Sequence, residues 1–513
     1  MRSTFYVTTP IYYVNDNPHI GHAYTTILAD VLARYHRSEG EEVFFLTGLD
    51  EHGQKVQQAA QKRGVPEQQH CDELAPRFSN LWKKLEIRND DFIRTTEPRH
   101  VKAVQAALQK VYDAGDVYAD EYEGWYSVAE ERFITDTEKE SGHFRDVKRL
   151  KECNYFFKMS KYQQRLIEHI NAHPEFIQPE HRKNEILGFL RQPLGDLCIS
   201  RPKSRMGWGI EIPFDKDYVT YVWFDALINY ITAAGYLADE EKFKKWWPAS
   251  VHLIGKDILT THAVYWPTML FSLGLPLPKT IFAHGWWLIG ETKMSKSLGN
   301  VVDPLSLVDQ YGVDPVRYYL MREMVLGQDA NFTMESFIKR YNSDLANDFG
   351  NLLNRVSGLI HKYFNGQIPS EGNFRGAEYV SVRGLVTGVP GSDTLEVKIQ
   401  KHIKAFAIQE AIKETMFLIQ QANRFLEKMA PWKVTDSQQV GTVLYTATEA
   451  LRISAVLLSP VIPSKAQTVL ETLGASGTEP RWGQLKAGTK LQNHDALFPR
   501  LDEQGKIITK ENK

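Results

Sequence analysis

The sequence is poor in cysteine, lacks long apolar runs and has almost no net charge. Three of its 513 residues are cysteines, Cys71, Cys153 and Cys198, and they lie far apart. This spacing excludes a disulfide framework and a CxxC metal site, and it is typical of a reducing, cytoplasmic compartment. Since no apolar run reaches the roughly 18 residues that span a bilayer, we expect no membrane partner.

The small charge and the N-terminal pattern exclude further classes. A net charge of −2 gives no sign of a nucleic-acid partner, so any RNA-binding surface must be local. The opening MRSTFYVTTPIYYV reads directly as a strand and lacks the apolar core of a signal peptide. With 42% hydrophobic and 24% charged residues, the composition indicates a folded chain. Its length predicts roughly two to four domains.

The first fifty residues have the pattern of a strand, a helix and a second strand. Residues 3–9 alternate and are rich in β-formers, and apolar residues recur at helical spacing from Ile20 to Tyr35. Gly40 ends that helix, and the apolar run EVFFLTGLD at 42–50 predicts a buried strand. A βαβ unit of this kind predicts a parallel sheet.

Strand and helix patterns continue along the chain, with an interruption. We expect helices at about 53–63, 66–86 and 98–113, and short aromatic strands in an insertion at 116–217. The alternation resumes with strands at 218–224, 250–255 and 279–285 and helices that start near Asp225 and Asp257. Beyond residue 300, long patterns at 334–365 and 394–430 predict a helical bundle, and the glycine-rich stretch 366–393 predicts a connecting loop.

The tetrapeptide HIGH follows the first strand, where ligands bind in open parallel sheets. His19 and His22 share a face once the chain is helical, and Pro18 indicates that a helix begins here. A helix N-terminus attracts phosphate, imidazoles can donate to phosphate oxygens, and Gly21 lets a flat base approach the backbone. The alternative is a pair of histidines that only cap the helix.

A second candidate is the stretch GETKMSKSLGN at 290–300. Lys293 and Lys296 stand among small, polar and glycine residues, so the stretch predicts a loop that closes over a polyphosphate. A lysine-rich loop is more often a solvated surface. The combination of KMSKS with an HIGH some 270 residues earlier is far more specific.

Together these motifs resemble the paired signature of class I aminoacyl-tRNA synthetases. TTPIYYVNDNPHIGHAYT, TGLDEHGQKV, YVWFDALINY, LIGKDILTTHAVYWPTML, HGWWLIGETKMSKSLGN and EKMAPW are similar to the methionyl-tRNA synthetases in particular. The resemblance implies an α/β fold, with a Rossmann-like catalytic domain split by a connective insertion and followed by an α-helical anticodon-binding bundle. The domains expected are 1–115 and 218–300 (catalytic halves), 116–217 (insertion), 301–345 (stem-contact region) and 346–513 (anticodon-binding domain).

The resemblance implies that methionine attacks ATP, supplied with Mg²⁺, and that the methionyl group then passes to tRNA(Met), the initiator included. His19, Gly21 and His22 would contact the ATP phosphates, with Lys293 and Lys296 on the leaving pyrophosphate. Gly255 and Asp257 of the GKD stretch would meet the ribose, although Asp257 could equally be an N-cap. Catalysis would come from alignment and charge stabilisation.

The same resemblance maps a methionine pocket onto nine positions. A thioether is apolar and a weak acceptor, so shape and aromatic contact must select it. Trp223 would form a wall, Tyr13 and His262 could offer donors toward the sulfur, and Asp50 would pair with the α-ammonium. The alternative for each aromatic is core packing. The full set is Ile11, Tyr13, Asp50, Trp223, Ala226, Leu227, Tyr230, Ile258 and His262, with Leu227 at a position where some relatives carry proline.

For tRNA, the resemblance assigns anticodon reading to the helical C-terminal region. Asn351 and Arg355 stand at i and i+4 and suit base edges, and Trp432 offers a face for an unstacked base. A surface pair and a buried tryptophan are the alternatives.

The sequence departs from many relatives in its inserted region. Where these carry a zinc knuckle built from CxxC pairs, this chain has one cysteine, Cys153, and one histidine, His143. Two ligands cannot complete a four-coordinate site, so we expect no structural zinc and no other metal site. The chain ends soon after its last helical patterns, so we also expect it to lack a C-terminal dimer-forming domain and to be monomeric.

Three other readings remain open at this point. Another class I synthetase, for leucine, isoleucine, valine or cysteine, would need a larger editing insertion or zinc-binding cysteines. A small nucleotidylyltransferase also uses HxGH but needs no helical bundle. A non-catalytic RNA-binding relative could keep the fold, although intact HIGH and KMSKS argue against that.

Overall fold

The computed structural model describes residues 3–14, 17–127, 132–134, 136–140, 146–289, 292–293, 302–372, 376–475 and 479–508. The chain divides into two compact units. The first comprises residues 1–18, 40–83 and 87–284, and the second comprises residues 19–39, 84–86 and 285–513. The described part contains no helix long and apolar enough to cross a membrane.

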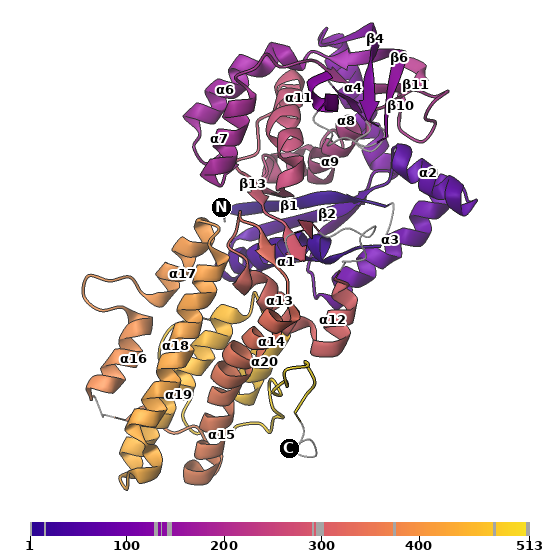
Figure 1. Ribbon diagram of the computed structural model, residues 1–513. Coiled ribbons are helices and arrows are strands. Elements are labelled where there is room, and N and C mark those ends of the chain that lie inside the picture. Colours follow the sequence, from indigo (N-terminus) through magenta and orange to yellow (C-terminus); the bar gives the residue numbers. More distant parts are fainter. Residues whose placement is uncertain are drawn as a thin grey trace. The chain divides into compact units, whose positions relative to one another are not determined.

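The first unit is built on a six-stranded parallel sheet, as the βαβ pattern predicts (Figure 1). Its order is β3–β2–β1–β12–β13–β7, with bounds Asp91–Arg94, Glu42–Asp50, Thr4–Tyr13, Val251–Gly255, Ile281–His284 and Ile177–Gln178. Gly48 of β2 lies so close to β3 that a Cβ there would be 2.1 Å from the carbonyl oxygen of Ile93. An apolar core packs between this sheet and its helices.

Helices of the first unit follow the predicted positions closely in its N-terminal part. The helices there are α2 (Gln54–Arg63), α3 (Glu67–Lys84) and α4 (Pro98–Asp113). Later helices are α6 (Gln163–Ala172), α7 (Glu180–Phe189), α8 (Val222–Leu227), α9 (Asn229–Ala234), α10 (Glu240–Trp246) and α11 (Trp266–Leu273), with short turns η1 (Met159–Tyr162), η2 (Lys256–Ile258) and η3 (Thr261–Tyr265).

The inserted region forms two small antiparallel sheets. One has the order β5–β4–β6–β8, with bounds Arg132–Ile134, Val117–Ser127, Val147–Phe157 and Leu197–Cys198, and α5 (Asp136–Glu140) follows β5. The other has the order β10–β11–β9, with bounds Glu211–Ile212, Asp215–Thr220 and Ser200–Pro202. The short strand β7, also in this stretch of sequence, pairs with β13 and extends the main sheet.

The second unit is mainly helical. Its helices are α1 (Ile20–Ser38), α12 (Pro304–Tyr311), α13 (Val313–Glu323), α14 (Met334–Arg340), η5 (Tyr341–Gly350), α15 (Asn351–Phe364), α16 (Ala377–Thr387), α17 (Leu395–Lys404), α18 (Ile408–Met429), η6 (Pro431–Lys433), α19 (Ser437–Leu458) and α20 (Pro463–Thr472). A small sheet β15–β14–β16 has bounds Thr292–Lys293, Trp287–Ile289 and Ala330–Asn331. Helix α18 lies beside α17 and α19, and α19 is buried on nearly all sides (Figure 1).

Helix α1, which begins at HIGH, is anchored within the second unit by a buried arginine. Arg317 of α13 donates from Nη2 to Oδ2 of Asp30 at 2.7 Å, and its other N–H groups donate to the carbonyls of Leu85, Pro460 and Val461. Both side chains are fully buried. Since each of the three nitrogens of this guanidinium donates to a partner, the buried charge is compensated and holds α1 in one orientation.

Several predicted elements are wrong in extent or type. The strand expected at 218–224 ends at Thr220, and helix α8 begins at Val222, so Trp223 is helical. The pattern at 394–430 forms two helices, because Phe406 takes a left-handed conformation (φ 57°) between them. The stretch 366–393, expected to be a loop, contains α16. The first strand continues to Tyr13, with a register shift between Thr8 and Ile11 around Pro10.

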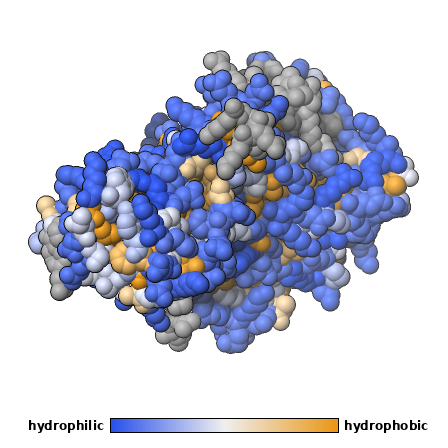
Figure 2. All heavy atoms as spheres, turned by 90° about the horizontal axis from the view of Figure 1, so that it is seen from below, coloured by the Kyte–Doolittle hydropathy of each residue, from blue (hydrophilic) through white to orange (hydrophobic). Residues whose placement is uncertain are grey.

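On the face shown in Figure 2, hydrophilic residues predominate and apolar residues form small groups. Among the described large apolar side chains, Phe417 of α18 and Trp432 of η6 are each 45% exposed.

Candidate functional site

The HIGH histidines form the N-terminal cap of α1. His19 is the N-cap residue, and its Nδ1 accepts a hydrogen bond from the backbone N–H of Gly21 at 3.1 Å. In return, Nδ1 of His22 accepts from the backbone N–H of His19 at 3.1 Å. The two rings stack with their centroids 3.8 Å apart. The predicted helix start and shared face are therefore confirmed, and both histidines also cap the helix.

This capping fixes where each ring carries its proton. A neutral imidazole has one N–H and one acceptor nitrogen. Because Nδ1 of His19 and Nδ1 of His22 each accept a backbone N–H, the proton of each neutral ring is on Nε2. The arrangement thus supplies two Nε2–H donors beside the positive end of a helix dipole, a combination that suits phosphate oxygens.

Gly21 is required by its neighbour in the same motif. A Cβ at this position would lie 2.9 Å from Cε1 of His19, closer than real Cβ contacts. A larger residue would displace the His19 ring and break the cap.

Gly255 and Asp257 lie together at the carboxyl end of β12. A Cβ on Gly255 would be 2.6 Å from Oδ1 of Asp257, so the carboxylate lies over the glycine. Asp257 is exposed and stands inside the turn η2, whose N-cap is Gly255 without a side-chain cap. The two residues predicted to meet the ribose are therefore neighbours, and Asp257 is not the N-cap of this turn.

Of the two lysines of KMSKS, the structure describes only Lys293. Lys293 ends β15, where its backbone pairs with Leu288 of β14 in antiparallel register. Lys296 lies outside the described residues.

The positions expected for methionine divide into half-buried and fully buried residues of the first unit. Asp50 ends β2 and is 2% exposed, and it stands opposite Tyr13 of β1 in the sheet register. Leu227 and Tyr230 belong to the core itself. Half-buried apolar side chains pack against that core from β1, α8 and η2, namely Ile11, Tyr13, Trp223 and Ile258.

Tyr230 and His262 are joined by a directed hydrogen-bond chain. Nδ1 of His262 donates a hydrogen bond to the carbonyl of Ile258 at 2.9 Å. Nε2 of the neutral ring therefore accepts a hydrogen bond from the hydroxyl of Tyr230 at 2.8 Å. Burial lowers the pKa of His262 to about 4, so the ring is neutral at pH 7. The donor expected of His262 toward sulfur is therefore used within the protein.

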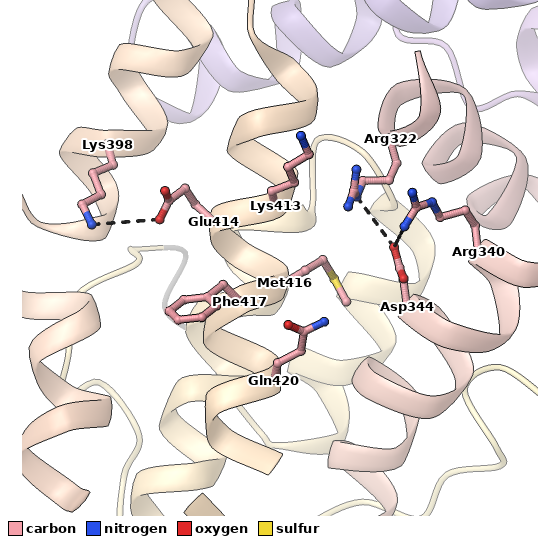
Figure 3. A pocket seen from close by; sticks show the side chains of 9 residues that line it. All are labelled: Arg322, Arg340, Asp344, Lys398, Lys413, Glu414, Met416, Phe417 and Gln420. Atoms are coloured by element: carbon pink, nitrogen blue, oxygen red, sulfur yellow. Dashed lines mark hydrogen bonds and ion pairs between the residues drawn. The ribbon is translucent and has the colours of Figure 1, made fainter. Parts of the chain in front are cut away.

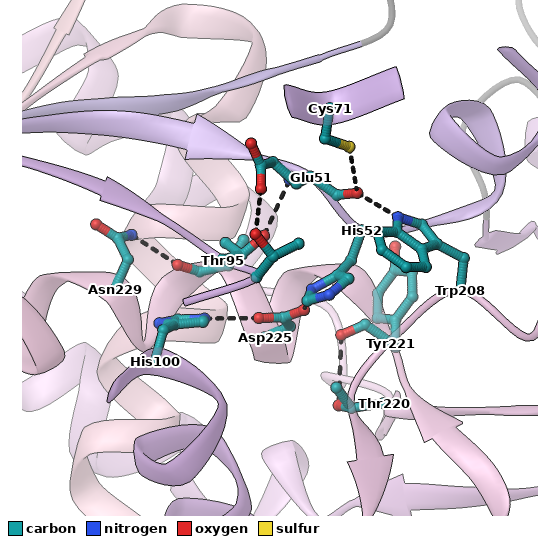
Figure 4. Close-up of polar contacts among 12 residues, drawn as sticks. Glu51, His52, Cys71, Thr95, His100, Trp208, Thr220, Tyr221, Asp225 and Asn229 are labelled. Atoms are coloured by element: carbon teal, nitrogen blue, oxygen red, sulfur yellow. Dashed lines mark hydrogen bonds and ion pairs between the residues drawn. The ribbon is translucent and has the colours of Figure 1, made fainter. Parts of the chain in front are cut away.

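Sequence reasoning missed a buried cluster that is centred on Asp225 (Figure 4). Asp225 of α8 accepts from Nδ1 of His52 at 2.7 Å and from Nε2 of His100 at 2.7 Å. Burial alone would raise the pKa of Asp225, but the two imidazoles outweigh it and hold the pKa below its ordinary value. The carboxylate is therefore ionised and only accepts. TGLDEHG and WFDAL contain His52 and Asp225, but nothing in the sequence pairs them.

The residues expected to read an anticodon lie on α15 and just after α18 in the second unit. Nη1 of Arg355 donates to Oδ1 of Asn423 at 3.2 Å and lies 3.4 Å from Oε1 of Glu427. Trp432 follows in η6 with 45% of its surface exposed, so it is not the buried tryptophan of the alternative reading. Asn351 begins α15 and is half-buried.

A cavity of about 560 Å³ in the second unit lies between α18 and the α13–α14 side (Figure 3). Its walls carry Arg322, Arg340, Lys398 and Lys413, and each has an acidic partner. Arg322 and Arg340 share the carboxylate of Asp344, so this cavity is lined by more cations than carboxylates.

Within the described ranges, no group of three or more histidine, cysteine, aspartate or glutamate side chains is arranged to hold a metal ion. Cys153 is exposed on β6, and His143 lies outside those ranges.

Known proteins match this chain in sequence and in fold. A family model described as class I tRNA synthetases (M) matches residues 5–142 and 144–357, and one described as the anticodon-binding domain of methionyl tRNA ligase matches 392–509. The methionine–tRNA ligase of Caldanaerobacter subterraneus subsp. tengcongensis is 44% identical over all of this chain and 81% of its own length. That of Clostridium tetani is 47% identical over 99% of this chain and 80% of its own length.

A solved structure also matches nearly the whole chain. Mycobacterium tuberculosis methionyl-tRNA synthetase in complex with methionyl-adenylate superposes with a TM-score of 0.92 at 39% identity, covering 97% of this chain and 100% of that one. The chain belongs to the methionyl-tRNA synthetases, the methionine–tRNA ligases of class I.

Proposed function

We propose that the HIGH histidines of this ligase bind the phosphates of ATP while methionine attacks the α-phosphate, giving methionyl-adenylate and pyrophosphate. The observation that carries this proposal is the pair of Nε2–H donors fixed by the cap of α1. The methionyl group then passes to the 3′ end of tRNA(Met), including the initiator. The adenylate named in the similar solved structure supports ATP as the substrate.

No general base is needed for the first step, because the methionine carboxylate is already a nucleophile. The protein contributes alignment and charge stabilisation at phosphorus. His19 and His22 donate from Nε2 to phosphate oxygens, and Gly21 keeps the His19 ring in place. Lys293 and Lys296 neutralise the leaving pyrophosphate, with Lys296 making the larger kinetic contribution. Mg²⁺ arrives with ATP, whose phosphate oxygens are ligands it prefers.

Gly255 and Asp257 are proposed to receive the ATP ribose. The carboxylate of Asp257 is exposed at the carboxyl end of β12, where a sugar diol can donate to it. The absence of a side chain on Gly255 leaves the space that this carboxylate occupies.

For methionine, Asp50 is proposed to pair with the α-ammonium, and half-buried apolar side chains hold the thioether. Trp223, Ile11, Tyr13 and Ile258 pack against a core that includes Leu227 and Tyr230. The neutral His262 lines this region with Ala226, so the sulfur meets ring edges and apolar groups, as its weak acceptor character requires.

For tRNA, Asn351 and Arg355 are proposed to meet anticodon base edges, and Trp432 to stack on an unpaired base. Arg355 is held by Asn423 and Glu427, which limits its rotamers before RNA arrives. The exposed ring of Trp432 supports the stacking role. We further expect a cytoplasmic monomer without structural zinc, to be tested by light scattering and metal analysis.

Charging of tRNA tests the second step. The protein should attach labelled methionine to a tRNA(Met) transcript and fail with a transcript whose anticodon is replaced. Equal charging of both transcripts would remove the anticodon role of Asn351, Arg355 and Trp432.

A further inference from the structure

Hydrogen bonds to several neighbouring elements hold the segment that follows β2. The carbonyl of Asp50 accepts from the N–H of Val14 at 3.2 Å. The N–H of Glu51 donates to Oγ1 of Thr95 at 2.9 Å, and its carbonyl accepts from Nε1 of Trp208 at 2.5 Å. These contacts fix residues 50–53 to β1, to the end of β3 and to the inserted region.

The carboxylate of Glu51 adds a further restraint to this segment. It accepts from Nε of Arg94 at 2.6 Å and from Oγ1 of Thr96 at 2.5 Å, and its side chain is fully buried. The backbone beside Asp50 is therefore restrained from several directions.

Among the contacts of this segment, one reaches α8. Nδ1 of His52 donates to Oδ2 of Asp225, while Nε2 of His100 on α4 donates to Oδ1 of the same carboxylate (Figure 4). Asp225 and His100 are fully buried and His52 is 6% exposed. Charge-assisted bonds of 2.7 Å are short and directional, so the three side chains fix the relative placement of three segments.

Helix α8 depends on such contacts because of its length. It has six residues and no side-chain cap, and so short a helix has little stability of its own. Trp223, Ala226 and Leu227 stand on this helix around Asp225. A rotation of α8 about its axis would move all three together.

We propose that Asp225, clamped by His52 and His100, is a positioning residue that sets the methionine pocket by locking α8 to the segment that carries Asp50. The inference rests on the proposed methionine site at Asp50 and Trp223. The clamp fixes the spacing between the group that binds the ammonium and the wall that holds the thioether. Its effect should fall on methionine and spare ATP, because the clamp joins the helix that carries Trp223 to the segment that carries Asp50, and both are proposed for methionine.

The sharpest variants keep or remove one N–H donor at a time. In His52→Asn, the amide nitrogen takes the place of Nδ1 and can still donate to Asp225, whereas His52→Ala removes the donor. We expect His52→Ala and Asp225→Ala to raise the methionine KM in ATP–pyrophosphate exchange by roughly 10- to 100-fold. The ATP KM should stay within about twofold of wild type, and His52→Asn should recover most of the loss.

A matched control is available in the same unit. Asp116 is 1% exposed and accepts from Lys161 at 2.6 Å, Ser272 at 2.7 Å and Tyr162, so it is also a buried, multiply bonded carboxylate. None of its partners belongs to the proposed methionine site. Asp116→Asn should lower the melting temperature without a selective rise in the methionine KM.

The outcomes separate this inference from the assignment of the pocket. The inference is overturned if Trp223→Ala raises the methionine KM while His52→Ala does not, or if Asp116→Asn raises it as much as His52→Ala. It is also overturned if methionine and ATP KM rise equally, or if His52→Asn gives no recovery. If Trp223→Ala leaves the methionine KM unchanged, the proposed pocket fails and this inference fails with it. Should Asp225→Ala not fold, the two His52 variants decide alone.

Discussion

The backbone N–H of His19 donates to Nδ1 of His22, and the two imidazoles stack with their centroids 3.8 Å apart. The same nitrogens that cap α1 thereby fix the tautomers of both rings. Sequence reasoning treats capping and phosphate binding as alternatives, but capping uses Nδ1 of each side chain, and the phosphate binding that we propose would use Nε2. A substitution can therefore remove one role and keep the other.

His19→Asn separates the two roles. Asparagine is a preferred N-cap, and its amide oxygen replaces Nδ1, so the free energy of unfolding should stay within about 0.5 kcal/mol of wild type. The variant lacks the Nε2–H, so methionine-dependent exchange should slow by roughly 10²- to 10³-fold. His19→Gln is the matched control, since its amide can donate near the Nε2 position but loses the cap. Wild-type exchange by His19→Asn would refute the phosphate role.

Lys296→Ala tests the second half of the proposed ATP site. A lysine that stabilises the leaving pyrophosphate acts mainly in the transition state, so ATP binding should remain measurable in Lys296→Ala. The activation free energy of exchange should rise by about 3–4 kcal/mol, which slows exchange. Lys293→Ala should have a smaller effect. Titration of ATP by calorimetry with parallel exchange assays measures both quantities, and unchanged exchange in Lys296→Ala would remove the role of the loop.

Trp432→Ala should weaken tRNA charging and leave exchange nearly intact. Loss of base stacking is worth about 1–3 kcal/mol, so kcat/KM for tRNA should fall roughly 5- to 150-fold. Phe417→Ala is a close control, because Phe417 is exposed to the same extent (45%) on the preceding helix. An equal loss in both variants, or an equal loss of exchange and charging in Trp432→Ala, would point to damage of the fold instead.

Asp314 gives the stability of the protein a dependence on pH. Burial raises the pKa of this carboxyl from 3.8 to about 6, against the opposing N–H of Lys465, which donates to Oδ2 at 2.5 Å. The folded state holds the proton of Asp314 more tightly than the unfolded state does. The contribution of this group to the free energy of unfolding is therefore complete below about pH 4 and is lost as the pH rises through about 6. The loss is at most about 3 kcal/mol.

Asp314→Asn should abolish this dependence, since the amide can still accept from the N–H of Lys465 but does not ionise. Relative to wild type, the variant should gain up to about 3 kcal/mol in unfolding free energy between about pH 4 and pH 7. Urea unfolding at several pH values measures the difference. A difference that does not change with pH would contradict the assignment.

Much of the fold and part of the site could be predicted from local pattern. The alternation of strand and helix, the apolar run at 42–50 and the helix start at HIGH are determined by neighbouring residues. Helix α1 and strand β2 are therefore predicted with small errors at their ends, whereas β1 continues to Tyr13 instead of ending at residue 9. The break at Phe406 was missed because the apolar period continues across it. Helix α16 was missed because glycines on both sides of it resemble a loop.

The clamp around Asp225 could not be predicted for a different reason. His52 and His100 lie 173 and 125 residues away from Asp225 in the sequence. No periodicity relates such residues, because His52 follows β2, His100 lies on α4 and Asp225 lies on α8, three elements that are far apart in the chain. The hydrogen bond between His262 and Tyr230 was likewise hidden, since the two residues lie 32 positions apart in the sequence.

The central claim is that the first step of this enzyme joins methionine to ATP. Its most direct test is amino-acid-dependent ATP–pyrophosphate exchange, measured with each of the twenty amino acids under identical conditions. We predict that methionine supports exchange with the highest kcat/KM. Exchange driven best by leucine or cysteine, or no exchange with any amino acid, would contradict it.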